Sequence, residues 1–221
     1  MKAMILAAGR GERLRPLTDT TPKPLIEVAG KPLIVHHLER LRDAGYTHIL
    51  VNTSWLADRI QEQLGDGGRY GVHIHYSYEG PEPLETGGGI FKALPQLGRD
   101  PFLVVNGDVH TDFPFETLKH RLKPDDLAHL VMVPNPAHHP AGDFHLTTTG
   151  HLRPNGEPKL TYSGIGVYKA DFFKECRAGK FPLLPLMRSA MAVEALSGES
   201  YGGRWADVGH LDNLKEHQQH K

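Results

Sequence analysis

Short apolar segments alternate with amphipathic helical patterns through the first half of this 221-residue chain. Six segments have the length and composition of buried strands: residues 4–7, 49–52, 72–78, 102–105, 127–133 and 164–168. Strand–helix–strand units connect in a right-handed sense and build parallel sheets that helices cover on both faces. The sequence therefore predicts an α/β fold with a Rossmann-like, mixed and mainly parallel sheet.

Two helices in this half have clear boundaries. The first is predicted over residues 32–44, where Pro32 suits the first turn and Gly45 suits the stop. The second is predicted to run from Ser54, as its N-cap, to about Leu64. Both show apolar residues at helical spacing, so each should bury one face against the sheet.

The pattern changes at about residue 126. Turn-rich pieces at 134–140 and 153–158 interrupt shorter strand-like segments. We expect this half to add antiparallel strands and a lid or substrate wall to the same sheet. No Gly/Ser-rich linker marks a boundary, so a single domain is predicted over residues 1–221.

Composition and net charge restrict the kinds of partner and the cellular compartment that suit this protein. A formal net charge of −1 argues against a general nucleic-acid binder, and no apolar run approaches the length of a membrane span. Cys176 is the only cysteine, which excludes an internal disulfide and favours a reducing, cytoplasmic compartment. The 15 histidines are scattered without a Cys/His zinc spacing. Those that lie near one another, His73 with His75 and His138 with His139, are interpreted as surface or structural residues.

A glycine-rich, cationic loop follows the first predicted strand. Its two glycines are Gly9 and Gly11, and its four cationic side chains are Arg10, Arg13, Arg15 and Lys23. Leu14 stands where a dinucleotide-binding loop has its third glycine, and Gly30-Lys31-Pro32 lacks the hydroxyl of a P-loop. Glycines let backbone N–H groups approach phosphate oxygens, and guanidinium and ammonium groups pair with them. The loop suits a triphosphate, although a solvated basic turn would look the same.

The string LAAGRGERLRPLTDTTPKPLIEVAGKPLI resembles the opening of the sugar-1-phosphate nucleotidyltransferases, which reads LAAGxGxRLxPxTxxxPKPxxxxxGxPxI. Two further strings, VVNGDV with Asp108 and RWADVGHLDNL with Asp207, resemble family motifs near the middle and end of the chain. Glu12 stands where many members have Thr or Ser, so its backbone N–H is the expected contact. His210 stands where Thr is usual, at a position normally outside the metal shell.

The resemblance implies the nucleotide-diphospho-sugar transferase type of fold and a reaction in which a sugar 1-phosphate attacks the α-phosphorus of a nucleoside triphosphate. It implies a Mg²⁺ cofactor held by Asp108 and Asp207. The implied catalytic residues are Lys23, Arg13 and Asp108, with Lys23 neutralising charge near the reacting phosphates and Arg13 holding the β- and γ-phosphates. From the residues alone, Asp108 could instead form a turn and Asp207 could cap a helix.

The resemblance also assigns nucleotide contacts to about residues 1–125. These are Gly9, Gly11, Glu12, Arg13, Lys23, Glu79, Gly87 and Gly88. LETGGGI, at residues 84–90, corresponds to the base-reading segment that is often LGTAGA, although a glycine-rich helix start is compatible with the same string. A carboxylate at Glu79 would accept a ring N–H, which disfavours cytosine but does not separate uracil from guanine.

The second half, about residues 126–221, is expected to bind the sugar. Candidate contacts there and at the strand end before it are Asn106, Gly142, Asp143 and Tyr162, and candidates for binding a lactyl carboxylate are Arg153, Lys159, Arg204 and His145. The segment Glu85–Gly89, the short chain and the WADVG ending are most similar to members that use UTP and N-acetylmuramic acid α-1-phosphate in cell-wall recycling. A mannose-1-phosphate guanylyltransferase and a catalytically silent nucleotide-sensing subunit remain the alternatives.

Overall fold

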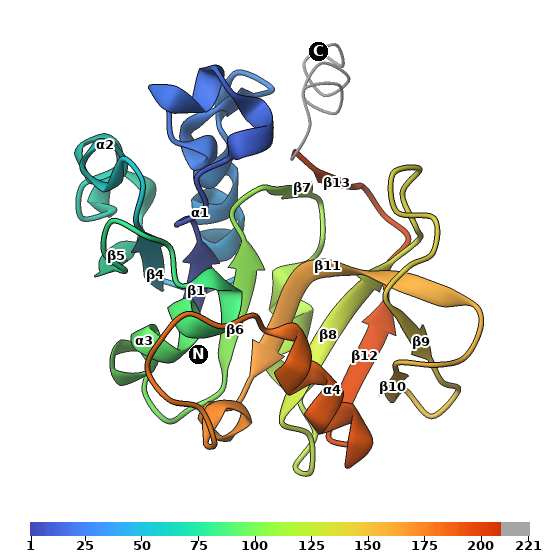
Figure 1. Cartoon of the computed structure of the whole chain (residues 1–221). Helices are drawn as coiled ribbons and strands as arrows, with labels where there is room; N and C mark the ends of the chain where they lie inside the picture. Colours follow the sequence, from blue (N-terminus) through green and yellow to red (C-terminus); the bar gives the residue numbers. More distant parts are fainter. Residues whose placement is uncertain (209–221) are drawn as a thin grey trace.

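The computed structural model describes residues 1–208, and a nine-stranded mixed sheet lies at its centre (Figure 1). The main path of the sheet runs in the order β10 (Leu152–Arg153), β9 (Phe144–Leu146), β11 (Lys159–Tyr168), β6 (Phe102–Asn106), β1 (Ala3–Leu6), β4 (His48–Thr53) and β5 (His73–Tyr78). Two more strands extend from this path, β8 (Ala128–Val133) beside β11 and β12 (Leu196–Ser200) beside β8.

The predicted parallel half is confirmed. Strand β1 pairs in parallel with β4 and β6, and β4 pairs in parallel with β5. Along β1 the side chains alternate between two apolar clusters, with Ala3 and Ile5 in one and Met4 in the other. Helices α1 (Leu33–Asp43) and α2 (Ala57–Leu64) cover the first face, whereas α3 (Glu85–Leu97) and α4 (Leu184–Ala192) cover the second, nearer the viewer in Figure 1.

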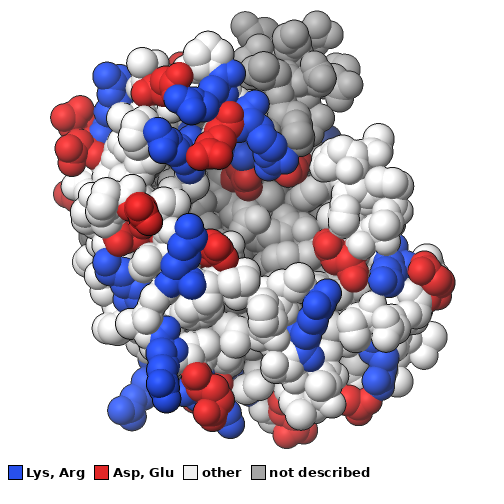
Figure 2. Space-filling view, in the orientation of Figure 1, with Lys and Arg blue, Asp and Glu red and all other residues white. Residues whose placement is uncertain are grey.

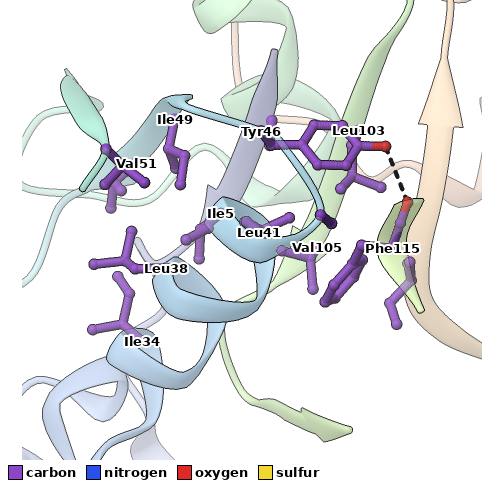
Figure 3. Close-up of a cluster of buried hydrophobic side chains, with 14 of the residues drawn as sticks. Ile5, Ile34, Leu38, Leu41, Tyr46, Ile49, Val51, Leu103, Val105 and Phe115 are labelled. Atoms are coloured by element: carbon purple, nitrogen blue, oxygen red, sulfur yellow. Dashed lines mark hydrogen bonds between the residues drawn. The ribbon is translucent and has the colours of Figure 1, made fainter. Parts of the chain in front are cut away.

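The face of α1 that the sequence predicted does reach the core. Leu38 and Leu41 are fully buried against the sheet, with Ile5 among their neighbours (Figure 3). Burying such a side chain contributes roughly 1.5–3 kcal/mol. After the helix, the Tyr46 hydroxyl donates a hydrogen bond of 3.1 Å to the carbonyl oxygen of Phe115. This bond satisfies the one polar atom that the ring carries into the cluster.

The second helix begins later than predicted, and Ser54 is not its N-cap. Helix α2 starts at Ala57, after Leu56 in the left-handed region with φ 51°. The Ser54 hydroxyl donates instead to the carbonyl oxygen of Gly80 at 2.8 Å. Ser54 therefore joins the turn after β4 to the turn after β5, a long-range contact that local spacing does not reveal.

The second half adds antiparallel strands, as predicted. Strand β11 runs antiparallel to β6, β8 and β9, while β12 is parallel to β8. The pairing of β11 with β6 makes the two halves share one sheet. Two short ribbons lie outside it: β2 (Glu27–Val28) with β3 (Lys31–Pro32), and β7 (Val109–Thr111) with β13 (Trp205–Asp207). Strand β13 thereby returns to the segment that follows β6.

Short 3₁₀ helices complete the description: η1 (Glu12–Leu14), η2 (Leu17–Asp19), η3 (Lys23–Leu25), η4 (Gly68–Tyr70), η5 (Phe115–His120) and η6 (Ala170–Phe173). Within residues 1–208, no helix combines the length and apolarity that crossing a membrane requires. His73 and His75 are both exposed on β5, which confirms their interpretation as surface residues. His210 lies outside the described residues.

Candidate functional site

A cavity of about 210 Å³ opens where the parallel strands end. Each of four strands contributes a lining residue at or just beyond its carboxyl end: Gly9 after β1, Asn52 in β4, Glu79 after β5 and Asp108 after β6. Ligands of open α/β sheets bind at this edge. Figure 2 shows the molecule hollowed on this face, with acidic and basic side chains together on the upper rim of the hollow.

Lys23 and Asp108 meet in this cavity. The Lys23 ammonium lies 2.5 Å from a carboxylate oxygen of Asp108, and the two side chains are 11% and 29% exposed. Gly107 explains how Asp108 reaches its position, because its N–H bonds to the carbonyl oxygen of Leu6 and a Cβ there would lie 2.6 Å from the same atom. The Asn-Gly-Asp string thus allows the chain to pass close against the end of β1.

Asp207 lies beside Asp108, although the two are far apart in sequence. Asp207 pairs with Val109 across the β7–β13 ribbon, and the N–H of Val208 donates to the carbonyl oxygen of Asp108 at 2.8 Å. The predicted neighbourhood of these two aspartates and Lys23 is therefore found. Asp108 lies in the turn after β6, as the alternative interpretation allowed, and it also forms the ion pair with Lys23 in the cavity. Asp207 ends β13, and the residues whose helix it could cap lie outside the described ones.

A clamp made by Asp112 holds the β7–β13 ribbon together. Its carboxylate accepts hydrogen bonds from the backbone N–H and the Nε of Arg204, at 2.7 and 3.0 Å, and from the Tyr201 hydroxyl at 2.5 Å. Desolvation raises the pKa of Asp112, but the bonds from Tyr201 and Arg204 outweigh it and lower the pKa to about 2. Arg204, a candidate for the lactyl carboxylate, thus already pairs with a protein carboxylate.

The cationic loop has its own small core and is not a solvated turn. Leu14 is buried with Ile26, Val28, Leu33 and Val208, so the loop packs against the residue next to Asp207. Gly11 has φ 68°, and a Cβ there would lie 2.9 Å from the Thr18 side chain. The Thr18 hydroxyl donates to the carbonyl oxygen of Gly11 at 2.8 Å. These contacts give the glycine and threonine of the motif a structural reason.

The arginines of the loop have different surroundings. Arg10 lies over the ring of Trp55 at 4.4 Å, and exposed Arg15 pairs with Asp19 at 2.7 Å. Arg13 and Glu12 are exposed on η1 and do not line the cavity. Gly9 does line it, and a Cβ at this position would meet nothing within 4 Å. The space beside Gly9 is thus open to a ligand.

A buried network joins three strands at the floor of the cavity. Asn52 accepts a hydrogen bond from the backbone N–H of Ala7 at 2.7 Å and donates one to Glu79 at 2.6 Å. The other carboxylate oxygen of Glu79 accepts from the N–H of Leu84 at 2.6 Å. Both oxygens of Glu79 therefore have protein partners. Sequence reasoning missed Asn52, whose signal was a polar residue at the end of a buried strand.

The triple glycine of α3 serves packing within the chain. Cβ atoms at Gly87 and Gly88 would lie 2.6 Å from the Phe181 ring and 2.3 Å from the carbonyl oxygen of Gly179. Neither glycine lines the cavity, whereas Glu85 and Thr86 do. The glycines let the segment 179–181 approach the helix, so the structure provides no sign of the base contact predicted for them.

Of the predicted sugar contacts, Asn106 lines the cavity and Gly142, Asp143 and Tyr162 do not. Asp143 accepts hydrogen bonds from the backbone N–H of Tyr162 at 2.8 Å and from His139 at 3.0 Å. The Tyr162 ring packs into an apolar cluster, where its hydroxyl meets that of Tyr168 at 2.9 Å and burial raises its pKa. The half-buried Tyr162 ring thus packs against the core, and its contact with a sugar stays a prediction.

The remaining candidates for a lactyl carboxylate differ in their partners. Arg153 pairs with Glu194, and the Nδ1 of His145 lies 2.9 Å from the carbonyl oxygen of Pro158. Lys159 is half-buried at the start of β11, and its backbone N–H donates a hydrogen bond to the Glu157 carboxylate at 3.2 Å. None of the three lines the cavity between β1 and β6.

The donor set suits a divalent cation with oxygen ligands. Asp108 already neutralises an ammonium in the cavity, so this site attracts positive charge. Desolvation lowers the pKa of nearby buried His37 to about 4, despite the opposing effect of the Asp108 charge, and His37 is therefore neutral at pH 7. Among residues 1–208 no group of three or more metal-ligating side chains gathers. Mg²⁺ needs only one or two protein carboxylates when phosphates supply the other ligands.

Comparison with known proteins agrees with this geometry. A family model described as nucleotidyl transferase matches residues 2–221. The N-acetylmuramate alpha-1-phosphate uridylyltransferase of Neisseria meningitidis serogroup B is 53% identical over 224 residues, which cover 99% of this chain and 97% of that protein. Mannose-1-phosphate guanyltransferase beta-B of Xenopus laevis is 42% identical over 121 residues, covering 53% of this chain and 33% of that protein.

A solved structure confirms the fold class. The crystal structure of a putative glucose-1-phosphate thymidylyltransferase from Bacillus anthracis, in complex with sucrose, superposes with a TM-score of 0.85 and covers 99% of this chain and 94% of that one. Its sequence identity is 20%, so the likeness concerns the fold alone.

Proposed function

This chain belongs to the nucleotidyl transferase family, and from that premise we propose that it transfers a uridylyl group from UTP to N-acetylmuramic acid α-1-phosphate. The products are the UDP-sugar and pyrophosphate. In this proposal about residues 1–125 bind the nucleotide and about residues 126–221 bind the sugar, within one domain. The reaction serves peptidoglycan recycling in the cytoplasm.

This reaction requires the protein to position two substrates, and it does not require a general base. A phosphate oxygen of the sugar 1-phosphate, already anionic at neutral pH, forms a bond to the α-phosphorus of UTP. The bond from that phosphorus to the bridging oxygen breaks, and its electron pair leaves with pyrophosphate. The protein must bring two anions into line and stabilise the charge that develops. Lys23 carries a cation into the cavity, and the open space at Gly9 admits phosphate oxygens to the backbone.

Asp108 and Asp207 are the residues that would hold magnesium. Their backbones are hydrogen-bonded neighbours, and carboxylate oxygens are the ligands this ion prefers. When bound, the ion supplies positive charge that stabilises the triphosphate. Lys23 provides a cation beside the same carboxylate, so with the ion bound two sources of positive charge would face the reacting phosphates.

One observation carries the proposal: Lys23 and Asp108 form an ion pair in the cavity at the carboxyl edge of the sheet, and the β7–β13 ribbon brings the backbone of Asp207 beside that of Asp108. A protein that only senses a nucleotide has no need of this set. The uracil nucleotide and the sugar are supported by the near-full-length identity of 53% with the uridylyltransferase. The guanyltransferase relative matches over 53% of the chain, which makes GTP with mannose 1-phosphate the second candidate.

A matrix of nucleoside triphosphates and sugar 1-phosphates, assayed for pyrophosphate release with Mg²⁺, tests the proposal. We expect turnover with UTP and N-acetylmuramic acid α-1-phosphate. Activity confined to GTP and mannose 1-phosphate would identify the protein as a mannose-1-phosphate guanylyltransferase. Nucleotide binding without any product would assign a sensor.

The Asp108→Ala variant tests the metal site within the same assay. We expect turnover to fall at least about a thousandfold, since charge stabilisation at a transferring phosphoryl group is worth several kcal/mol. Exposed Asp125 offers a matched control, and Asp125→Ala should keep the wild-type rate. Circular dichroism should show both variants folded. Near-normal turnover of Asp108→Ala would remove Asp108 from the site.

A further inference from the structure

Glu85 is a strained residue at the cavity. It opens α3 with φ 61°, in the left-handed region that costs an L-residue conformational energy. Four non-glycine residues of the described chain have positive φ, and only Glu85 lines the cavity. A glycine would adopt this conformation without strain. A glutamate at this strained position therefore suggests that its carboxylate has a role in the cavity.

The backbone on both sides of Glu85 is held by other parts of the chain. The N–H of Leu84 bonds to buried Glu79, and the carbonyl oxygen of Leu84 accepts from Phe181 at 3.2 Å. On the other side, the N–H of Gly88 donates to the carbonyl oxygen of Phe181 at 3.0 Å. These contacts impose the left-handed conformation and fix the position from which the side chain leaves the helix.

The Glu85 carboxylate has no hydrogen bond or ion pair with any residue of the described chain, and the residue is exposed. Glu79, the other carboxylate at this end of the cavity, differs because both of its oxygens already accept protein N–H groups. Among the carboxylates that line the cavity, Glu85 is therefore the one whose oxygens accept no hydrogen bond from the described chain.

Glu85 and Lys23 line the same cavity, at positions that follow different strands of the sheet. The cation that faces phosphates, Lys23, lies with Asp108 beyond the end of β6, next to β1. The segment that leads to Glu85 follows β5, which is two strands from β1 in the order β1-β4-β5. Counted from β6, which Asp108 follows, β5 is three strand spacings away, about 14 Å at about 4.8 Å per strand, which a nucleoside triphosphate spans. A nucleotide with its phosphates at Lys23 would therefore have its base near Glu85.

We propose that the Glu85 carboxylate accepts the ring N–H of the base and so selects uracil over cytosine. The inference rests on the proposed function, since it concerns the nucleotide of the same site. Uracil carries a hydrogen on N3, which a carboxylate accepts, whereas cytosine presents a lone pair at that atom and is repelled. Glu79 then acts as a positioning residue, holding the Leu84 backbone from which Glu85 extends.

The experiment compares wild type with Glu85→Gly, Glu85→Gln and a control, Glu82→Gln. Glu82 is exposed in the same loop and does not line the cavity. For each protein, kcat/KM is measured with UTP, N3-methyl-UTP, 2′-deoxy-UTP and CTP, and the binding of UTP and N3-methyl-UTP is measured by calorimetry without the sugar. Thermal melting monitors the fold.

We expect wild type to prefer UTP to N3-methyl-UTP by about tenfold or more, the effect of one hydrogen bond to a charged group. Glu85→Gly should abolish this preference by raising KM for UTP, with a melting temperature no lower than that of wild type because strain is relieved. Glu85→Gln should gain activity with CTP relative to UTP, since an amide N–H can donate to cytosine N3. Glu82→Gln should behave like wild type.

Three results would overturn the inference. One is a Glu85→Gly protein that keeps the wild-type preference for UTP over N3-methyl-UTP. The second is a lower melting temperature with unchanged KM, which would make Glu85 structural. The third is a loss of preference for UTP over 2′-deoxy-UTP alone, which would place Glu85 at the ribose. Failure of the proposed function is distinguishable, because it would appear as wild-type protein that binds UTP in the calorimeter without forming product.

Discussion

At the scale of single residues, Lys23 occupies a place that suits a metal ion. Its ammonium lies 2.5 Å from the Asp108 carboxylate and is largely shielded from water. A buried charge needs a partner, and each of these two side chains supplies one for the other. Lys23 and a divalent cation therefore compete for the same carboxylate when no nucleotide is bound.

The Lys23→Met variant tests this competition. In the absence of nucleotide, we expect it to bind Mn²⁺ about tenfold more tightly than wild type, on the order of 1.4 kcal/mol, because the ammonium no longer occupies Asp108. Turnover should nevertheless fall, since a cation that faces the phosphates is lost. Electron paramagnetic resonance of free Mn²⁺ measures the affinity. Weaker metal binding in the variant would contradict the interpretation.

Asn52 shows how one side chain can support a site without touching the reacting atoms. Its amide connects Ala7 after β1 with Glu79 after β5, and both polar side chains are buried. Removing it leaves a backbone N–H and a carboxylate oxygen short of partners in the interior.

We expect Asn52→Ala to lower the free energy of unfolding by about 2–4 kcal/mol, the cost of unsatisfied buried groups of this kind. Urea denaturation at pH 7 measures the loss. Asn106→Ala provides the comparison, because Asn106 is half-buried in the cavity lining and its side chain has no comparable network. Equal losses for the two variants would argue against the network.

At the scale of elements, the β7–β13 ribbon decides whether Asp207 stays near Asp108. Strand β13 has three residues, too few to remain paired by backbone bonds alone. Asp112 supplies the additional bonds, to Arg204 and Tyr201. The position of Asp207 therefore depends on the Asp112 clamp at the other end of the β7–β13 ribbon.

The pKa of Asp112 makes this clamp pH-dependent. The folded pKa of about 2 is below the ordinary value of 3.8, so the charged carboxylate stabilises the fold above pH 4 and this contribution is lost as the pH falls toward 2. After a discount for its partial exposure, we expect a contribution on the order of 1 kcal/mol. Asp112→Asn should be less stable than wild type at pH 6, and the difference should shrink at pH 3. Urea denaturation at the two pH values measures it, and a constant difference would contradict the assignment.

At the scale of the whole molecule, the N-terminal loop and the C-terminal strand share one apolar cluster. Leu14 and Val208 are both buried in it. The loop that carries Lys23 and the ribbon that carries Asp207 are thereby packed together, so a change in one reaches the other.

Leu14→Ala tests this connection. We expect a loss of about 2–4 kcal/mol in the free energy of unfolding, typical of a truncated buried leucine. Looser packing should also speed tryptic cleavage at exposed Arg10 and Arg13 and weaken Mn²⁺ binding. Limited proteolysis and metal titration measure these effects. Leu17→Ala is the matched control, because Leu17 lies in the same loop but is 39% exposed. Similar cleavage rates in the two variants would contradict the connection.

Much of this architecture was predictable. The parallel strands and α1 were placed to within a few residues, because buried strands and amphipathic helices have local periods. The neighbourhood of Lys23, Asp108 and Asp207 followed from motif resemblance. The start of α2 was wrong, since Ser54 bonds to Gly80 across the sheet. The sequence also did not reveal that the half-buried Tyr162 ring packs beside Tyr168.

The sequence by itself determined the strand–helix alternation, the edge at which a ligand binds and the residue types suited to a triphosphate. These features follow from local spacing and from the side chains' own chemistry. Only the tertiary structure decided which polar groups are already satisfied: Glu79 by Asn52 and Leu84, and Arg204 by Asp112. The physical reason is that a hydrogen bond depends on which distant segment packs beside a residue, and no local pattern encodes that neighbour.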